Sequence, residues 1–525
     1  MLWETTGHPL EQNAVKTVCS FLAKFAGSIV AVLSCYDRVI LKGYLPFGGD
    51  EHLNSFVDGR LRIRRKDFLP EVQRMSQQLV DHAQQMAEEA GAPYHYLQGK
   101  HDKKRLIERI ARDRSHPEGL LAVLCFQETC RTVKLRHGRK KPRLQFAYRP
   151  QRVLYYYFHD PEFGRMHVRI QTWFPFTIQV YVNGHEWLAR QMLRQRLGFV
   201  QQDNAFTQLD DPAKAQQLAD RFPALRWQSH LAHWARVVNP HLKRGWLRGA
   251  TYRWVIDQAE FATDVIFRSK AALAQLYPRL LDHAAVNFSA QDILTFLGRR
   301  WHGRFDGEVV TECKKDRWPG ARIKHRMKNN WLKIYDKFAR LLRVETVINQ
   351  PREFKVRRSR RRHGRRQMLW CPMNKGIANF YQYHAAARAA NTRYLEALSV
   401  VADPKVAYQQ IKRLVESRRV RGRSYAGFNP ARDEDVRLFA AVLRGEHLLV
   451  GFRNADIRRL LHGDSSCPLG RRRHSASVGR KLKRLHVRGL LRKVPHTRRW
   501  QVTPAGQRLL GSAIRLYYHG LSTAA

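Results

Sequence analysis

The chain has 525 residues and carries 95 Lys and Arg against 44 Asp and Glu, so its formal net charge is +51. Apolar residues make up 44% and aromatic residues 11%, which excludes a disordered polycation and predicts a globular protein with roughly two to four domains. So large a cationic excess is self-repelling unless a polyanion neutralises it. We therefore expect a nucleic acid as the partner.

The seven cysteines are odd in number and form no CxxC pair, which argues against a disulfide framework or a zinc ribbon and favours a reducing cytosol. The first residues, MLWETTGHPLEQN, lack the basic segment of a signal peptide. The apolar run at 25–36 is too short to span a bilayer. We expect a cytoplasmic protein, compatible with nucleoid association, that has no membrane partner.

The predicted fold class is α+β, and residues 1–350 form its mixed α/β body. Residues 28–46 are expected to form two strands, separated by a polar break at Asp37 and Arg38. Residues 251–267 are rich in β-branched and aromatic side chains, which favours a strand, with a helix as the alternative. Further strands are expected at 120–126 and within 152–182. Helices are expected at 67–90, 101–113, 185–198, 212–221, 228–237 and 270–298.

Residues 322–349 are expected to form a hairpin whose polar face carries Lys333, Tyr335, Arg343 and Glu345 within cross-strand reach. One interpretation is structural: Glu345 pairs with Lys333 or Arg343, and Asp336 begins the turn. In the other, Glu345 and an acid from elsewhere hold a divalent cation, or the Tyr335 hydroxyl attacks a phosphodiester.

Three other acids are candidate metal ligands. Glu260 and Asp264 are four residues apart, which places them on one side of either a helix or a strand. Asp37 interrupts an apolar run, where an unpaired carboxylate would be costly. If the protein is an enzyme, we expect Asp37, Glu260, Asp264 and Glu345 to hold Mg²⁺ or Mn²⁺, as in a ribonuclease H-like transposase or nuclease. Binding alone would need no cofactor.

An arginine-rich stretch follows the body. Residues 351–370 are interpreted as a solvated linker or arm that contacts a nucleic-acid backbone, and 371–430 as a helical segment. The arm's candidate backbone contacts are Arg357, Arg358, Arg360, Arg361 and Arg362.

The C-terminal domain, residues 431–525, is predicted to contain three helices, at 434–445, 452–462 and 474–490. Two short strands joined by the tip PHTRR follow, and Thr503-Pro504 begins a last helix. Residues 471–499 contain twelve Lys or Arg and no Asp or Glu. We expect groove and phosphate contacts from the third helix and the strand tip. The residues concerned are Ser475, Ser477, Arg480, Lys481, Lys483, Arg484, Arg488, Arg498 and Arg499.

Three resemblances add to this interpretation. The strings GLLRKV and RWQVTPAG resemble the winged helix-turn-helix of MarR-like regulators, which implies a DNA-binding domain. The short string KIYDK followed by LRVE resembles a segment of rolling-circle replication initiators, which nick DNA with a tyrosine. The strings YDRVILKGYLP and HVRIQTWFPF resemble a widespread uncharacterised group of long bacterial proteins, which suggests an origin in a mobile element.

Together these features predict a DNA-binding protein whose body and arm contact the backbone while the winged helix reads a site. One alternative is a metal-dependent DNA nuclease or transposase-like enzyme. Another is a protein that binds a structured RNA. A homodimer is compatible with each.

Overall fold

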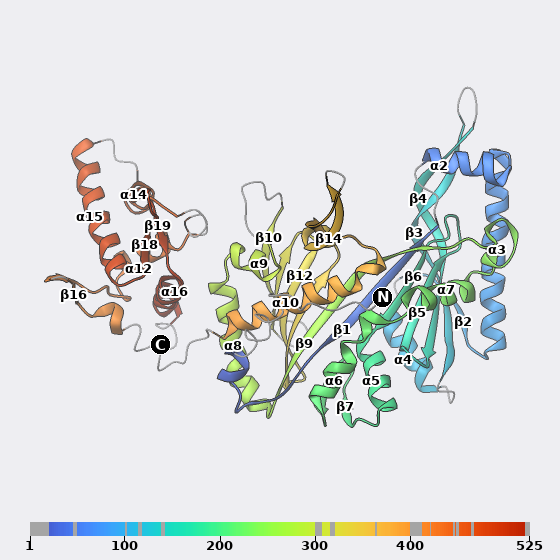
Figure 1. The fold of residues 1–525 in the computed structure, drawn as a ribbon, viewed down its shortest axis with the longest axis horizontal. Helices are drawn as coiled ribbons and strands as arrows, with labels where there is room; N and C mark the ends of the chain where they lie inside the picture. The colour runs from blue at the N-terminus through green and yellow to red at the C-terminus, as the bar shows by residue number, and fades with distance from the viewer. Residues whose placement is uncertain are drawn as a thin grey trace.

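The computed structural model describes residues 20–45, 50–99, 102–113, 118–137, 142–299, 307–314, 321–362, 365–399, 412–420, 422–444, 447, 451–463 and 467–519. In these residues the protein is α+β, as predicted, and a large mixed sheet forms the centre of the body (Figure 1). Part of the expected helical segment, residues 400–411, lies outside this description.

Within the described residues, eleven strands form the central sheet. Only β2 and β3 pair in parallel; the other neighbours are antiparallel. In spatial order the strands are β10 (Val309–Lys314), β11 (Arg322–Met327), β12 (Asn330–Lys337), β13 (Leu341–Ile348), β9 (Arg253–Phe267), β1 (Ile29–Tyr44), β6 (Ile178–Asn183), β5 (Gly164–Gln171), β4 (Arg143–Asp160), β3 (Gly119–Arg136) and β2 (Tyr94–Leu97).

The N-terminal strand differs from its prediction. Residues 29–44 form one continuous strand, β1, and Asp37 and Arg38 do not separate two strands. The chain stays extended through these polar residues because β9 and β6 pair with β1 on its two edges. The stretch around Glu260 is likewise a strand, β9, and the helical alternative is wrong.

Helices cover both faces of the sheet. The helix α10 (Phe380–Leu398) packs on one face, where the Asn391 amide bonds to the Phe261 carbonyl at 3.1 Å. On the other face, α5 (Gly184–Arg194) brings His185 close to Asp264 of β9. The remaining body helices and the small β7–β8 hairpin are α2 (Asp50–Ser55), α3 (Arg65–Glu89), α4 (Lys103–Asp113), α6 (Pro212–Ala219), α7 (Trp227–Val238), α8 (Lys270–Asn287), α9 (Ala290–Phe296), β7 (Phe199–Gln201) and β8 (Phe206–Leu209).

The arginine-rich stretch is not a linker. It forms a two-stranded antiparallel ribbon of β14 (Lys355–Arg362) and β15 (Arg365–Pro372). Val356 at the base of the ribbon is buried in the body core. The expected helical segment begins only at α10, because β15 occupies its first residues and a short 3₁₀ turn, Ile377–Asn379, follows.

A second hydrophobic core organises the C-terminal unit, which contains a short hairpin of β16 (Arg418–Val420) and β17 (Arg423–Tyr425). Leu414 and Phe428, from the expected helical segment, are part of this core. The other elements are α12 (Asp433–Val442), α14 (Asn454–His462), α15 (Pro468–Val487), β18 (Leu491–Lys493), β19 (Trp500–Val502) and α16 (Pro504–His519). The Gln507 amide of α16 bonds to the Asn287 carbonyl of the body at 3.0 Å.

Candidate functional site

A β-bulge in β1 brings Asp37 to the centre of the sheet. Tyr36 pairs with Phe261 and Val39 pairs with Ala259, so Asp37 and Arg38 together oppose the single residue Glu260. An extra residue of this kind redirects side chains locally and is common beside functional sites. The polar pair predicted to break the strand therefore marks the bulge.

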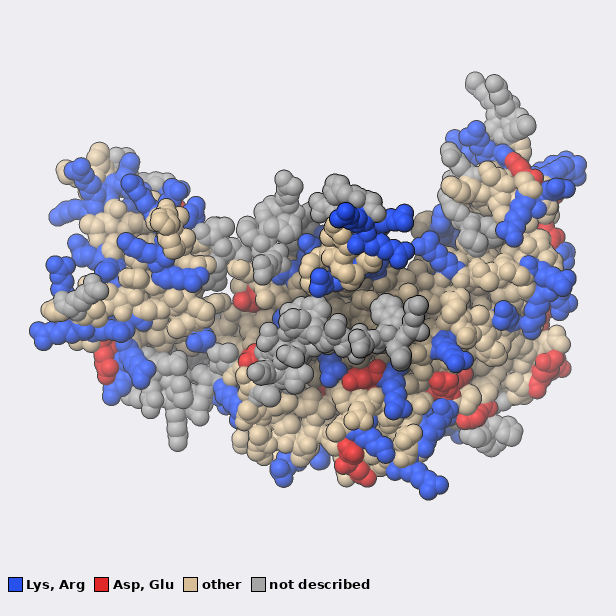
Figure 2. All heavy atoms as spheres, in the orientation of Figure 1, with Lys and Arg blue, Asp and Glu red and all other residues tan. Residues whose placement is uncertain are grey.

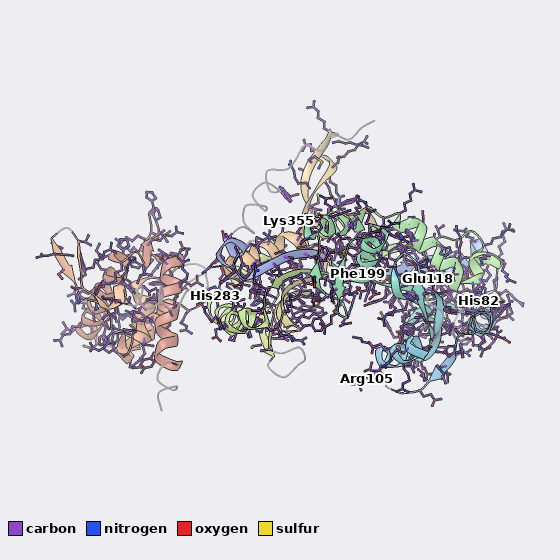
Figure 3. All side chains as sticks on the ribbon, turned by 90° about the horizontal axis from the view of Figure 1, so that it is seen from below. His82, Arg105, Glu118, Phe199, His283 and Lys355 are labelled. Carbon is purple, nitrogen blue, oxygen red and sulfur yellow. The ribbon has the colours of Figure 1, made fainter. Side chains whose placement is uncertain are left out.

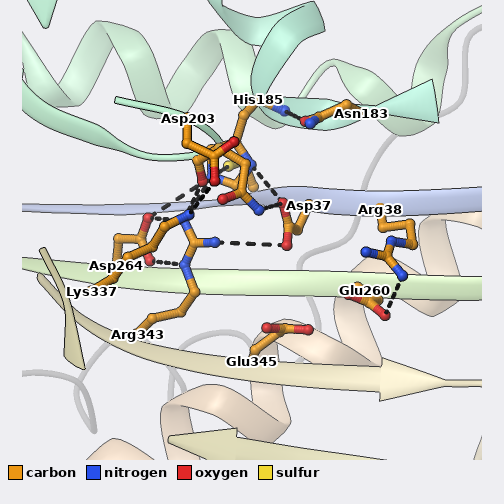
Figure 4. Close-up of polar contacts among 12 residues, drawn as sticks. Asp37, Arg38, Asn183, His185, Asp203, Glu260, Asp264, Lys337, Arg343 and Glu345 are labelled. Atoms are coloured by element: carbon orange, nitrogen blue, oxygen red, sulfur yellow. Dashed lines mark hydrogen bonds and ion pairs between the residues drawn. The ribbon is translucent and has the colours of Figure 1, made fainter. Parts of the chain in front are cut away.

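Three of the four predicted carboxylates converge beside this bulge. Asp37, Glu260 and Glu345 each offer an oxygen, and these oxygens lie within 4.8 Å of one another. The three residues come from β1, β9 and β13, which are adjacent in the sheet, and all three are buried (Figure 4). Strand pairing thus brings Asp37 next to two acids that lie 223 and 308 residues further along the chain.

Asp264 does not join this group. Both of its carboxylate oxygens accept hydrogen bonds from the Arg343 guanidinium, at 2.6 Å each. The same guanidinium donates to the Asn204 carbonyl at 2.6 Å. Asp264 is therefore a structural ion-pair partner in this arrangement, and the expectation that it would be a fourth metal ligand is not supported.

Asp37 is held as a carboxylate by its neighbours. His185 Nδ1 lies 3.2 Å from Asp37 Oδ1, and the Asn204 amide donates to the same oxygen at 2.6 Å. Burial alone would raise the pKa of Asp37, but His185 and the charge of Arg343 outweigh it and lower that pKa. Burial lowers the pKa of His185, whereas nearby Cys35, Asp264 and Asp37 raise it well above its usual value.

Glu345 pairs with Lys333, as the structural interpretation of the hairpin predicts. Lys333 lies directly opposite it in the register and donates to its Oε1 at 2.8 Å. The Tyr335 hydroxyl donates to Oε2 at 2.6 Å. Burial and the charge of Glu345 raise the pKa of Tyr335, which keeps the phenol protonated and disfavours it as a nucleophile. Asp336 lies within β12, and the turn begins after Lys337.

Glu260 is the least compensated acid of the three. Its ion-pair partner is Arg38, at 3.9 Å, and the Arg38 side chain is 47% exposed. Burial and the adjacent Glu345 raise the pKa of Glu260 to about 8. The Gln258 amide donates to it at 2.7 Å. Glu260 can therefore carry a proton near neutral pH, and Arg38 forms the exposed rim of the cluster.

The cluster contains as many basic groups as acidic groups. Four buried acids face the guanidinium groups of Arg38 and Arg343, the Lys333 ammonium and the His185 ring. A divalent cation bound by Asp37, Glu260 and Glu345 would have to displace Lys333 from Glu345 or take the proton from Glu260. The arrangement supplies three carboxylate ligands suited to Mg²⁺ or Mn²⁺, but it is also complete as an ion-pair network.

Sequence reasoning missed His185 and Asn204, which organise Asp37. Asn204 lies in the turn between β7 and β8. The placement of His185 depends on α5: the Asn183 side chain caps this helix by accepting from the His185 and Glu186 amides. The sequence signal for this helix is Asn183 at the end of β6, followed by Gly184. It predicts where the helix begins, but not that the following histidine faces β1.

In the C-terminal unit, α15 turns a cationic face outward. Val478, Leu482 and Leu485 pack in the core, so helical spacing places Arg480 and Lys483 on the opposite side, where both are exposed. Arg498 is exposed between β18 and β19, and Ser477 is half-buried. Figure 2 shows Lys and Arg side chains over much of the visible surface of this unit.

Other residues of the C-terminal unit that were predicted to contact nucleic acid make internal contacts in this structure. Arg488 donates to the carbonyls of Glu416, Tyr425 and Ala426. Arg484 donates to the Ala426 carbonyl at 2.9 Å. The remaining internal contacts are Lys481 with Glu434, Ser475 with Asn454, and Arg499 with the Gly451 carbonyl.

The arm residues lie on the ribbon. Arg357, Arg360 and Arg361 are exposed, whereas Arg358 is half-buried and donates to the Asn379 side chain. Arg362 ends β14, and its side chain lies outside the described residues.

No protein-family model, curated protein or solved structure matches the chain. Among the described helices, none is both long enough and apolar enough to cross a bilayer. The function must therefore be argued from the chemistry of these surfaces.

Proposed function

We propose that this protein binds nucleic acid, DNA in preference to RNA, and that its C-terminal unit is a winged helix-turn-helix. The observation that carries the proposal is the outward face of α15, which presents Arg480 and Lys483 within a 29-residue segment, 471–499, that has no acidic residue. An acid-free cationic helix face is suited to a phosphate backbone.

The order of elements supports this assignment. Three helices, α12, α14 and α15, are followed by the β18–β19 hairpin and by α16. In a winged helix, the third helix enters the major groove and the hairpin forms the wing. Arg498 lies at the tip of this hairpin, between Lys493 and Trp500, where a wing contacts the backbone or minor groove.

The internally bonded arginines support the same function indirectly. Arg484 and Arg488 hold the backbone at Ala426 and Glu416 against α15, and the Arg484 guanidinium lies 4.0 Å from the Phe428 ring centre. They fix the orientation of α15, while Arg480 and Lys483 on the same helix stay exposed. Preference for DNA follows from the use of winged helices in DNA recognition, which is an argument by analogy.

The proposal is tested by measuring binding of the full chain to labelled duplex DNA, by fluorescence anisotropy, over a range of salt concentrations. We expect log K to fall steeply with log salt, and Arg480→Ala with Lys483→Ala to reduce that slope by about 2. Arg437→Ala, an exposed arginine of α12 paired with Asp433, is the matched control and should change the slope little. A slope near zero for the wild type would refute the proposal, and tighter binding of RNA would reverse the preference.

The convergence of Asp37, Glu260 and Glu345 favours a second candidate function, metal-dependent cleavage of DNA. In such a reaction the bound metal would polarise a phosphodiester and activate water, which attacks phosphorus as the P–O bond breaks. The exposed guanidinium of Arg38 at the rim could contact a neighbouring phosphate.

The test is incubation of plasmid and single-stranded DNA with Mg²⁺ or Mn²⁺. Glu345→Gln and Asp37→Asn should abolish cleavage, whereas Asp257→Asn, a one-third exposed acid of β9 paired with Lys375, should retain it. Because buried substitutions can unfold the body, the melting temperature of each variant is measured with and without Mn²⁺. Cleavage that survives both substitutions would show that these acids are not the catalytic site. If no substrate is cleaved, nucleic-acid binding remains as the proposed function and cleavage is refuted.

A further inference from the structure

The two faces of the β14–β15 ribbon differ in their surroundings. Cross-strand partners share a face, so Val356 with Cys371 and Arg358 with Leu369 form one side, which packs toward the body. The side chains of the other face are exposed: Lys355, Arg357, Ser359, Arg361, Arg366, Met368, Trp370 and Pro372. Figure 3 shows the ribbon standing out from the body, with Lys355 at its base.

This outward face combines arginines with large apolar side chains. Trp370 is 56% exposed and lies opposite Arg357, while Met368 is 55% exposed and lies opposite Ser359. Toward the tip, Arg361 pairs with Arg366. The two strands contain eight Lys or Arg and no Asp or Glu. An exposed indole set among arginines, with no acid on either strand, is complementary to a polyanion that also offers a flat aromatic surface.

From these observations we propose that the ribbon binds single-stranded nucleic acid, with an unpaired base stacked on the Trp370 indole and the adjacent phosphates held by Arg357, Arg361 and Arg366. The inference rests on the proposed nucleic-acid-binding function and adds a second ligand form, the single strand. Stacking on aromatic side chains beside a cationic track is how such strands are bound without base-specific hydrogen bonds.

The position of Trp370 along the ribbon favours a single strand over a duplex. Trp370 is five residues from Arg365 at the tip, which is about 17 Å at the strand rise of 3.3 Å per residue. Both grooves of B-DNA are only about 8 Å deep. A ribbon inserted tip-first would therefore leave the indole far from the groove floor, and paired bases would not expose their faces to it. An unpaired base can reach Trp370 without insertion.

Anchoring at the base of the ribbon makes the surface suitable for stacking. Val356 and Phe354 are part of the body core, and Arg358 is bonded to Asn379. The Trp370 backbone pairs with that of Arg357. The indole is thus carried on a strand fixed to the body, which reduces the ordering cost of binding.

The test compares binding of a labelled oligothymidine strand of about twenty nucleotides with binding of a duplex of the same length, using the full chain. Trp370→Ala should weaken single-strand binding by about 5- to 150-fold, the effect of losing one stacked base. Trp370→Phe should retain most of the affinity, and the duplex affinity should not change. Tyr96→Ala, an exposed aromatic on the edge strand β2, is the matched control and should bind as the wild type does.

The slope of log K against log salt should be the same for Trp370→Ala and the wild type, because stacking releases no counterions, whereas Arg357→Ala should lower it by about 1. Unchanged single-strand affinity of Trp370→Ala would overturn the inference while leaving the proposed function intact. Equal weakening on strand and duplex would also overturn it. A wild-type protein that binds neither ligand at low salt would refute the proposed function, and this inference with it.

Discussion

Replacing Arg343 by Ala should destabilise the body more than any surface charge substitution. The Arg343 side chain is fully buried, and its guanidinium donates two hydrogen bonds to Asp264 and one to the Asn204 carbonyl, all at 2.6 Å. It also lies 3.6 Å from Asp37. Its removal leaves two buried carboxylates without their shared cation.

The expected loss follows from this geometry. Removing one partner of a buried ion pair costs about 3–5 kcal/mol, because the other charge stays buried and uncompensated. An exposed pair contributes about 0–1 kcal/mol. Arg74, whose side chain is 61% exposed and which pairs with Glu71 on α3, is therefore the matched control: Arg74→Ala should cost less than about 1 kcal/mol.

The assay is urea unfolding of the full chain at neutral pH, followed by tryptophan fluorescence, with the slope m compared among variants. Combining Arg343→Ala with Asp264→Asn should recover part of the loss, which gives a coupling energy of about 0.5–3 kcal/mol. If Arg343→Ala costs no more than Arg74→Ala, or if the double variant recovers nothing, the network does not stabilise the sheet and the reasoning fails.

Three further predictions concern other parts of the molecule. The pKa of Glu260 is raised to about 8 in the folded protein, so the folded state binds more protons than the unfolded state above a pH of about 4.5, and the free energy of unfolding should fall as pH rises toward 8. Glu260→Gln should flatten this pH dependence when stability is measured by urea unfolding, and an unchanged profile would contradict the prediction. Arg484→Ala should lower the melting temperature of the C-terminal unit without reducing the salt slope of DNA binding, unlike Arg480→Ala; a reduced slope would show that Arg484 contacts phosphate. A Cβ at Gly184 would lie 2.1 Å from the Tyr36 carbonyl oxygen, so Gly184→Ala should cost at least about 1–3 kcal/mol in urea unfolding, whereas Gly27→Ala, with no atom within 4 Å, should cost little more than a surface substitution.

Local patterns predicted much of the secondary structure. The apolar spacing of 67–90 corresponds to α3, and the alternation in 322–349 places Lys333 opposite Glu345, as expected. Periodicity succeeds here because burial of one face is a local property of a helix or hairpin. Thr503 directly precedes α16, as predicted, and Pro504 is its first residue, a position where the backbone N–H has no partner within the helix.

The arginine ribbon and the strand β1 show where local patterns fail. A run of arginines is typical of a solvated segment, yet β14 and β15 pair with each other and Val356 is buried in the body core. Asp37 and Arg38 looked like a break, but hydrogen bonds from the strands on both edges keep β1 extended through a bulge. In both cases, pairing with another strand outweighs the preference of the local sequence.

The sequence by itself determined the charge of this protein, the kinds of side chain available to a nucleic acid, and the helices and hairpins whose faces alternate within a few residues. Only the tertiary structure decided which acids meet. Asp37, Glu260 and Glu345 come together because β1, β9 and β13 are neighbours, whereas Asp264, on the same strand as Glu260, is taken by Arg343. Strand order depends on the burial and hydrogen bonding of the whole sheet. The spacing of residues along the chain therefore does not predict it.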